Sequence, residues 1–242
     1  MSKCAIISDI HGNLEALQAV LKTCQTLGVQ FFFCGGDTIG YGASPLECLE
    51  TIKKLKAPTV AGNHDWAITG AIDSSHFTSD GKAAVAWTRG KLGLEHITSL
   101  NSLPLVLRNK LFLITHATLN EPILFHRLRE VEDAQKTFDL MDRPLCFVGH
   151  THIPIIITQQ NGNIFFTDWT EVQINPKNKF IVNVGSVGQP RDANPLASFC
   201  VYDTDTRMIE IKRVAYNIAG AQKKIIEAGL PQDLASRLAV GK

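Results

Sequence analysis

Seven side chains of the kinds that bind metal ions follow short apolar segments of the chain. They are Asp9, His11, Asp37, Asn63, His116, His150 and His152. A single histidine at a strand end is more often a hydrogen-bonded structural residue than a ligand. Because the pattern recurs at five segment ends, most of them beside a glycine, and because sheets collect functional groups at one edge, we expect these side chains to meet in one site.

The ligand types indicate which metals they bind, and their number indicates how many ions. Imidazole and carboxylate without thiolate suit manganese, iron, cobalt, nickel or zinc rather than calcium or magnesium alone. Seven ligands exceed what one ion with an open position needs. They suit two ions about 3.5–4 Å apart that share one carboxylate. Asp37 is the expected bridge.

The charge of such a centre points to its substrate. Two divalent ions carry four positive charges, whereas only Asp9 and Asp37 among the ligands are anionic. The centre stays positive even with a bridging hydroxide, so it should attract an anion. A phosphate ester fits, because one oxygen can contact both ions while a metal-held hydroxide attacks phosphorus in line.

The segment from Phe31 to Asp37 is the one around which the chain is organised. Its four apolar residues predict a strand buried on both faces. Gly35 and Gly36 then leave the backbone free to turn and give Asp37 room to project. A carboxylate at the end of a buried strand is costly unless a cation or a donor meets it. Standing alone, Asp37 would more simply be a helix cap or a loop residue.

The sequence of the first third of the chain predicts alternating strands and helices. The segments are a strand over 3–10, a helix from an Asn13 cap to Gly28, the strand at 31–34, a helix from a Ser44 capping box to about Lys54, and a short strand at 59–61. This order implies parallel strands joined by right-handed crossovers.

The rest of the chain predicts a helical excursion and then many short strands. The excursion covers 66–100, a hairpin follows at 105–107 and 111–115, and a helix at 131–140 precedes a strand at 145–148. Further strands are expected at 155–157, 164–167, 172–174, 180–184, 199–202 and 208–214, and helices at 218–228 and from Pro231. We interpret this second half as an antiparallel sheet.

One domain over residues 1–242 is the simplest organisation: an α+β or α-β fold with a two-sheet sandwich core flanked by helices. Two domains, one α/β and one β-rich, are the alternative. The candidate ligands come from both halves of the chain, which argues against that division.

Composition narrows the function further. A formal net charge of +1 without a long basic run argues against an extended nucleic-acid duplex as partner. The N-terminus shows no signal peptide and no apolar run is long enough to span a membrane, so we expect a cytoplasmic protein. The six scattered cysteines contain no C-x-x-C, which favours reduced core residues over disulfides or a thiolate zinc site.

The same motifs resemble the calcineurin-like metallophosphoesterase superfamily, whose pattern is D-x-H, G-D, G-N-H-[D/E], H and G-H-x-H in that order. Here it is matched by Asp9-Ile10-His11, Gly36-Asp37, Gly62-Asn63-His64-Asp65, His116 and Gly149-His150-Thr151-His152. The segment from Gly185 to Asp192 also looks like the small prokaryotic branch with diadenosine-tetraphosphatase-like and cyclic-phosphodiesterase-like members.

The resemblance implies a role for each matched residue. Asp9, His11 and His152 would hold one ion. Asn63, His116 and His150 would hold the other, with Asp37 shared. His64 would contact the phosphate and protonate the leaving oxygen. The implied cofactors are two divalent transition-metal ions, manganese first, with iron, zinc, cobalt or nickel as alternatives. The implied fold is the family's two-sheet sandwich with helices outside.

Two departures from the pattern narrow the activity. Protein Ser/Thr phosphatases carry G-D-x-x-D-R-G, but the segment from Asp37 to Gly42 lacks both the second aspartate and the arginine. Purple acid phosphatases have a tyrosine ligand three residues after the aspartate. Gly40 occupies that position and Tyr41 lies one residue further on, so neither activity is expected.

Three other residues are candidates for substrate binding. Asn13 could contact phosphate or simply cap a helix, Tyr41 could stack on a base or pack in the core, and Arg191 could clamp a phosphate or remain solvated. The walls that select the substrate should come from 66–100 and 119–142. His76 and His96 have no partner in the sequence and are expected at the surface.

The leading hypothesis is therefore a dinuclear phosphoesterase acting on a small phosphorylated metabolite or nucleotide. A phosphodiester or dinucleoside polyphosphate is favoured over a phosphoprotein. The alternative to an enzyme is a non-catalytic scaffold or binding protein of the same fold. Such relatives usually lose metal ligands, and this chain has lost none. A DNA-processing nuclease would need a basic groove that the near-neutral charge does not support. The sequence does not indicate the oligomeric state.

Overall fold

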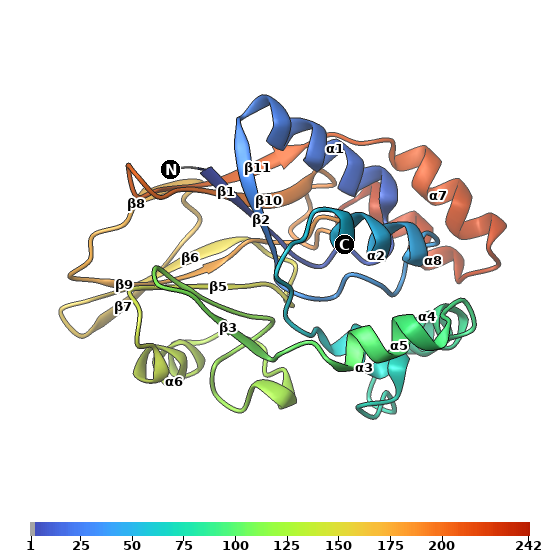
Figure 1. Cartoon of the computed structure of the whole chain (residues 1–242), viewed down its shortest axis with the longest axis horizontal. Coiled ribbons are helices and arrows are strands. Elements are labelled where there is room, and N and C mark those ends of the chain that lie inside the picture. Colours follow the sequence, from blue (N-terminus) through green and yellow to red (C-terminus); the bar gives the residue numbers. More distant parts are fainter. Residues whose placement is uncertain (1–2) are drawn as a thin grey trace.

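The computed structural model describes residues 3–242, which form two stacked sheets covered by helices (Figure 1). Met1 and Ser2, part of the N-terminal stretch considered above for a signal peptide, lie outside the described residues. The expected fold class, a two-sheet core flanked by helices, is confirmed. Within residues 3–242, no helix is both long and apolar enough to cross a membrane.

Each sheet combines strands from both halves of the chain. The first sheet has the order β2-β1-β10-β11-β8, with β1 (Lys3–Ile7), β2 (Val29–Cys34), β8 (Glu171–Gln173), β10 (Ala197–Asp203) and β11 (Met208–Val214). The second has the order β3-β4-β5-β9-β6-β7, with β3 (Val106–Arg108), β4 (Leu113–Thr115), β5 (Leu145–Val148), β6 (Ile155–Gln160), β7 (Asn163–Thr167) and β9 (Lys179–Asn183).

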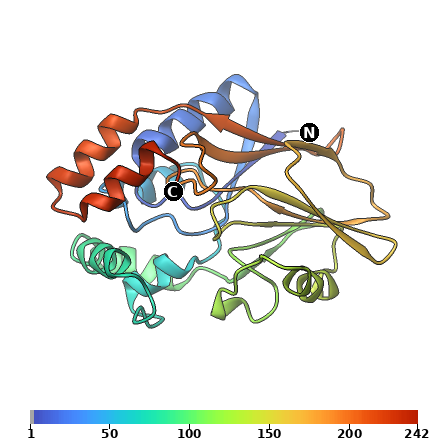
Figure 2. The ribbon, with the colours of Figure 1, turned by 180° about the vertical axis from the view of Figure 1, so that it is seen from behind.

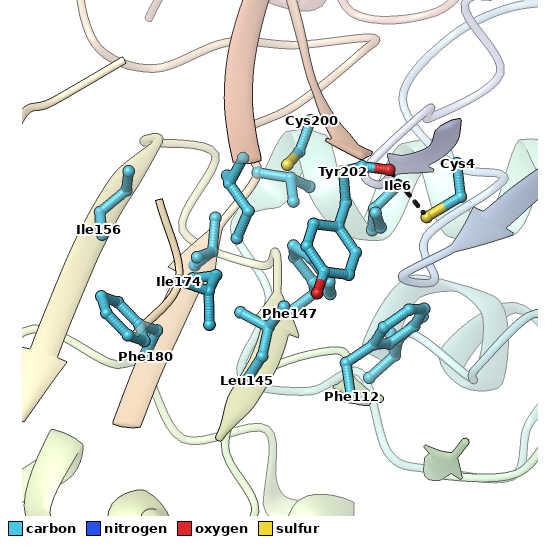
Figure 3. Close-up of a cluster of buried hydrophobic side chains, with 14 of the residues drawn as sticks. Cys4, Ile6, Phe112, Leu145, Phe147, Ile156, Ile174, Phe180, Cys200 and Tyr202 are labelled. Atoms are coloured by element: carbon cyan, nitrogen blue, oxygen red, sulfur yellow. Dashed lines mark hydrogen bonds between the residues drawn. The ribbon is translucent and has the colours of Figure 1, made fainter. Parts of the chain in front are cut away.

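The layer between the sheets is an aromatic and aliphatic core. Figure 3 shows Phe112, Phe147 and Tyr202 gathered there, and the ring of Phe112 lies 5.2 Å from that of Phe147 and 6.0 Å from that of Tyr202. Ile6 comes from the first sheet and Ile156 from the second, and both are fully buried in this layer. Burial of such side chains supplies the main force that holds the sheets face to face.

Helices cover the outer faces of both sheets. α1 (Leu14–Thr26) and α2 (Pro45–Lys54) pack on the first sheet. α7 (Ile218–Glu227) lies against α1, and α8 (Gln232–Ser236) and the 3-10 turn η2 (Arg237–Ala239) lie against α7. Figures 1 and 2 show all of them on one side of the molecule. α6 (Val131–Leu140) covers the second sheet, where Phe138 packs on Cys146 and Ile181.

A separate helical group lies beside the ends of the sheets. It consists of α3 (Asn63–Thr69), α4 (Ser79–Arg89) and α5 (Leu94–Asn101), and the 3-10 turn η1 (Pro122–Leu124) follows later in the chain. Figure 1 shows α3, α4 and α5 apart from α1 and α2, as expected for the helical excursion predicted over 66–100.

Helix starts were predicted with mixed success. Asn13 caps α1, because its Oδ1 accepts a hydrogen bond from the Ala16 N–H at 3.1 Å. α2 has the predicted bounds, but Ser44 makes no side-chain capping bond, so the capping box was wrong. Pro45 at the first helical position, with a φ already near the helical value, is sufficient to begin that helix.

The strand at Phe31 is not buried on both faces as predicted. β2 is the edge strand of its sheet, and the Phe31 side chain is 48% exposed. Phe32 packs toward the α1 side and Phe33 toward the core between the sheets, but neither is fully buried. Only Cys34, at the end that leads to Asp37, is enclosed completely. An apolar run could not reveal that, except at Cys34, this strand pairs on one side only.

The second half of the chain does not form a sheet of its own, which corrects the antiparallel interpretation. β10 pairs antiparallel with β1, whereas β9 pairs parallel with β5. The short strand expected at 59–61 is reduced to a single parallel bridge between Thr59 and Cys34. Long-range pairing, which local patterns do not encode, decided both outcomes.

Candidate metal centre

The ends of strands from both sheets meet at one place, where they deliver the predicted ligands. Asp9 follows β1 and Asp37 follows β2 in the first sheet, and His116 directly follows β4 in the second. His150 and His152 follow β5, and Asn63 begins α3. The seven side chains therefore converge, although they come from segments up to 143 residues apart in sequence (9 to 152).

One half of the cluster is made by an aspartate and two histidines. Asp9 Oδ1 lies 3.2 Å from His152 Nε2 and 3.8 Å from His11 Nε2. The two Nε2 atoms of His11 and His152 are 3.1 Å apart. Ligand atoms of all three residues lie within 4.8 Å of one another, close enough to bind a common ion.

The other half is centred on an amide oxygen. Asn63 Oδ1 lies 2.9 Å from His150 Nδ1 and 3.2 Å from His116 Nε2. Asp37 connects the halves, because its Oδ2 is 3.3 Å from His116 Nε2 and 3.6 Å from His11 Nε2. The aspartate expected as a bridge therefore lies between the two groups of ligands.

Backbone carbonyls fix the rings of three of these histidines. His116 Nδ1 lies 2.7 Å from the Gly35 carbonyl oxygen, and His152 Nδ1 lies 2.6 Å from that of Gln189. His11 Nδ1 lies 3.3 Å from the Ile39 carbonyl oxygen. A carbonyl can only accept, so each ring donates from Nδ1 and directs its Nε2 atom toward the cluster.

This arrangement tests whether a metal fits. With both Nδ1 atoms protonated, His11 and His152 face each other with two lone pairs over 3.1 Å, which is unfavourable unless a cation lies between or beside them. Imidazole, carboxylate and amide donors without thiolate suit first-row divalent ions. The residues present therefore fit the metal ions that the sequence predicts.

The pKa values of the histidines in the cluster also agree with metal binding. Burial lowers the pKa of His11 well below its usual value and that of His150 to about 3, so both are neutral, as ligands must be. Burial also acts on His116, but the carboxylates of Asp37 and Asp9 outweigh it and raise the pKa of His116 to about 10. A site that protonates a buried imidazole between two carboxylates is a site with a place for positive charge.

Several of these residues have a backbone conformation that L-amino acids rarely adopt. Left-handed φ angles between 50° and 66° occur at Asp9, His11, Asp37, Tyr41, His150 and His152. Each costs free energy, and such residues persist only where the surrounding structure holds them. Their concentration here indicates that the fold positions these side chains at some expense of stability. No sequence signal revealed this strain.

Gly149 shows why a glycine stands beside the ligands. A Cβ on Gly149 would lie 2.2 Å from Asp9 Oδ2, which is far inside contact distance. Without that atom, the β5 end can approach Asp9 so closely that the His150 N–H donates to its carboxylate at 3.0 Å. The glycine therefore brings the two sheets together at the cluster.

Asp65 has a role that the sequence analysis missed, although it belongs to the quoted motif. Its Oδ2 accepts hydrogen bonds from the N–H groups of Asp37 at 2.8 Å and Gly62 at 3.2 Å, and its Oδ1 accepts from Ile39 N–H at 3.3 Å. Burial and the charge of Asp37 raise the pKa of Asp65 to about 7, while these three donors favour the ionised form. Asp65 therefore holds the loop that presents Asp37.

His64 differs from the other histidines of the cluster. Its Nδ1 is buried, and among residues 3–242 it has no hydrogen-bond partner. Its ring lies 4.3 Å from that of Tyr41 and 4.7 Å from that of Phe77. Burial lowers the pKa of His64 to about 4. A phosphate dianion placed opposite the ring would raise that value again.

A cavity of about 670 Å³ opens from the cluster, a size typical of small-molecule sites. Its lining includes Asp37, Asn63, His64, His150 and His152. The walls come from Ile72, Asp73, His76, Phe77 and Thr78, and from Ile123, Leu124, Phe125 and Arg127. These are parts of the two segments expected to form the walls.

The three substrate-binding candidates have different positions. Tyr41 and Arg191 both line the cavity, and the Arg191 guanidinium carbon lies 5.6 Å from the Tyr41 ring centre. Asn13 is not in that lining. Its Oδ1 caps α1 and its amide donates to the Gly188 carbonyl at 2.8 Å, so its structural alternative is favoured.

Two wall residues escaped the sequence analysis. His76 is exposed, as expected, but it lines the cavity. Arg237 reaches the cavity from η2, close to the end of the chain and outside every motif. No sequence signal could have found Arg237, because a lone arginine in a short polar helix normally points to solvent.

Gly40 occupies the position at which purple acid phosphatases have a tyrosine ligand, and its surroundings explain why a tyrosine does not fit there. Its φ is +100°, and a Cβ there would lie 2.9 Å from His64 Nδ1. A side chain at this position would displace His64. The ligand pattern of purple acid phosphatases is therefore incompatible with the position of His64 here.

Comparison with known proteins agrees with this geometry. The model of the calcineurin-like phosphoesterase superfamily domain matches residues 2–207. An uncharacterized protein of Methanocaldococcus jannaschii is 38% identical over 247 residues, covering 100% of this chain and 99% of that protein. The crystal structure of a metallophosphoesterase from Sphaerobacter thermophilus has a TM-score of 0.88 at 37% sequence identity, with 100% of this chain and 99% of that chain covered.

A shorter part of the chain is similar to an enzyme of named activity. A symmetrical bis(5′-nucleosyl)-tetraphosphatase of Actinobacillus pleuropneumoniae is 40% identical over 63 residues, which are 25% of this chain and 23% of that protein. The resemblance noted in the sequence is thereby confirmed. Because the family model spans most of the chain, the chain belongs to the calcineurin-like phosphoesterase superfamily and is a metal-dependent phosphoester hydrolase.

Proposed function

We propose that the protein is a dinuclear phosphoesterase that hydrolyses P–O bonds of small phosphorylated metabolites or nucleotides. Phosphodiesters and dinucleoside polyphosphates are favoured over phosphoproteins. One ion would be held by Asp9, His11 and His152, the other by Asn63, His116 and His150, and Asp37 would be shared. Manganese is the metal we expect first.

The observation that carries this proposal is the pair of Nε2 lone pairs of His11 and His152, which face each other over 3.1 Å beside Asp9. Asp37 also lies 3.3 Å from His116, which with Asn63 and His150 forms the second group of ligand atoms. Two ligand sets joined by one carboxylate are the arrangement that two ions require. When bound, the ions would neutralise charge on the phosphate and activate water as the nucleophile.

The residues of the chain have the remaining tasks. His64 lies beside the ligands, with a ring nitrogen within 4.8 Å of ligand atoms of His11 and Asp37, and would protonate the leaving oxygen. Tyr41 and Phe77 flank its ring and restrict its movement. Arg191 and Tyr41 line the cavity where the rest of the substrate must lie.

The size of the cavity supports a small substrate rather than a phosphoprotein. A volume of about 670 Å³ accommodates a nucleotide. The short similarity to a dinucleoside tetraphosphatase points the same way. The lack of the aspartate and arginine that protein phosphatases carry after Asp37 also argues against a protein substrate.

Two further expectations belong to this proposal. We expect residues 1–242 to act as a single domain, because ligands from both sheets complete one centre. We also expect the protein to work in the cytoplasm. All six cysteines are free and buried, which suits a reducing compartment.

Metal analysis and hydrolysis assays test the proposal together. The purified protein should bind two equivalents of manganese per chain and hydrolyse bis-p-nitrophenyl phosphate. A panel of diadenosine tetraphosphate, cyclic nucleotides and phosphomonoesters should then identify the preferred ester. A fully metallated protein that is inactive on the whole panel would support the alternative, a non-catalytic scaffold of the same fold.

A further inference from the structure

The cavity carries more positive charge than the metal centre needs. Arg127, Arg191 and Arg237 all line it, from three segments far apart in sequence. Arg191 lies in the loop after β9, and Arg237 in η2 beyond the last helix. Neither is a ligand candidate. Their presence in the lining of one cavity needs a separate explanation.

Arg191 is held in a fixed position. Its Nη2 donates to Gln189 Oε1 at 2.6 Å and its Nε to the same oxygen at 3.3 Å. Gln189 is 2% exposed and therefore fixed itself. The Arg191 N–H donates to the His152 carbonyl at 3.2 Å, which ties this part of the wall to the metal centre. A guanidinium bound to a neutral amide oxygen keeps its charge uncompensated.

Arg237 has no anion of its own. Within residues 3–242, no acidic oxygen lies within 4 Å of its guanidinium, although Asp80 and Asp233 act on it from farther away. It is partly buried, and burial together with the charge of Arg191 lowers the pKa of Arg237. Two arginines that repel each other across a cavity wall are stabilised when an anion enters between them.

Asp73, an acidic residue of the cavity lining, is not the anion that neutralises these arginines. Asp73 lines the cavity, but its Oδ1 accepts the Ser75 N–H at 2.9 Å and its Oδ2 accepts the Ser75 hydroxyl. Both of its oxygens are thus directed to its own loop. The anion that the arginines attract must come with the ligand.

Another part of the lining is apolar. Ile72, Phe77, Ile123, Leu124 and Phe125 line it, and the side chains of Ile123 and Leu124 are 50% and 55% exposed. Exposed aliphatic side chains that line a cavity favour a ligand with a flat or apolar portion. The cavity therefore combines the metal centre, a cationic wall and an apolar wall.

We propose that Arg191 and Arg237 form a second anion subsite, which holds a phosphate group of the substrate other than the one that reacts. The apolar wall then receives a nucleobase. The substrate class is a nucleotide with at least two phosphate groups, such as a nucleoside or dinucleoside polyphosphate, and Arg237 determines specificity for it. This inference rests on the function proposed above.

The test compares two substrates that differ in the second phosphate. Diadenosine tetraphosphate can reach the subsite, whereas bis-p-nitrophenyl phosphate has a single phosphorus. For Arg237→Ala we expect the KM for diadenosine tetraphosphate to rise about 10- to 100-fold, as for a lost charge-assisted hydrogen bond, with kcat within about twofold. The KM for bis-p-nitrophenyl phosphate should not change, and Arg237→Lys should recover part of the loss.

Arg129→Ala is the matched control, because Arg129 is exposed but is not among the cavity-lining residues and its loss changes the net charge equally. Equal effects of Arg237→Ala on both substrates, or no effect on either, would overturn the subsite. If Arg237→Ala lowers the melting temperature strongly, Arg237→Gln, which keeps most of the stem, takes its place in the same comparison.

A binding measurement separates failure of the subsite from failure of the proposed function. Calorimetry with α,β-methylene adenosine diphosphate on the purified full chain should show binding about tenfold weaker or more in Arg237→Ala than in Arg129→Ala. If no ester is hydrolysed with any metal, the function fails while this difference still supports the subsite. Equal affinities in the two variants would overturn the subsite even in an active enzyme.

Discussion

The metal cluster and the outer cavity wall adjoin each other but are built in opposite ways. Asp9 and His11 are 0% and 1% exposed, and backbone groups hold the side chains of the cluster from several sides. Ile123 and Leu124 lie on a short 3-10 turn and are about half exposed. Many contacts determine the positions of the side chains in the first region, whereas the exposed side chains of the second have few.

We infer that the metal cluster determines which reaction occurs, whereas the cavity wall determines which substrate is chosen. A residue of the cluster cannot change without moving its neighbours, so the reaction type should be insensitive to everything except the ligands and their supports. An exposed residue of this turn can change without disturbing the fold, so the choice of substrate should be adjustable there. The following experiments test this division, from the largest expected effect to the smallest.

Asp37→Asn should have the largest effect, because the carboxylate lies between both ligand sets. We expect metal content to fall below one ion per chain and bis-p-nitrophenyl phosphate hydrolysis to drop by about 10³-fold or more. Atomic emission analysis and steady-state kinetics measure the two quantities. Asp139→Asn, an exposed aspartate on α6, is the matched control. One ion retained at full occupancy would show that Asp37 is not the bridge.

His64→Ala should lower turnover without loss of metal. Removal of a positioned general acid costs about 10²- to 10⁴-fold in kcat, whereas the ligand atoms remain in place. Kinetics and metal analysis on the same preparation check both halves of this expectation. His126→Ala, at an exposed histidine, should leave activity unchanged. Loss of an ion from the His64 variant would mean that His64 is itself a ligand.

Asp65→Asn should weaken the centre indirectly. Replacing one carboxylate oxygen with an NH₂ group leaves at least one of three buried N–H groups unpaired, and the Asp37 loop loses its anchor. We expect metal affinity to fall about 10- to 100-fold and the free energy of unfolding to fall by about 1–3 kcal/mol. Metal titration and urea denaturation measure these changes. Unchanged affinity together with lower stability would limit Asp65 to a structural role.

Leu124→Ala should have the smallest effect of the four on stability, but it should measurably weaken the binding of a nucleotide substrate. An exposed side chain contributes little to folding, so the free energy of unfolding should stay within about 0.5 kcal/mol. The KM for a nucleotide substrate should rise about three- to tenfold, as for a few lost methylene contacts. Leu94→Ala, at a leucine that is 78% exposed and outside the lining, is the control. A large fall in kcat would place Leu124 in the chemistry and contradict the division between the two regions.

The fold could be predicted from the sequence as far as local signals reach. The helix at 131–140 and the strand at 145–148 have the predicted bounds, because their hydrophobic period and end signals are local. The exposure of Phe31, and the division of the second half between two sheets, could not be predicted, because both depend on which strands pair across the whole chain.

The site shows the same limit. The types and order of its side chains determined the metal chemistry and the family, because short motifs carry the donors that two ions need. Only the tertiary structure could show that Asp65 holds the Asp37 loop, that carbonyls turn the histidine rings, and that Arg237 enters the cavity from the end of the chain. Such contacts join residues without a common local pattern, so they exist only after both sheets have closed on the cluster.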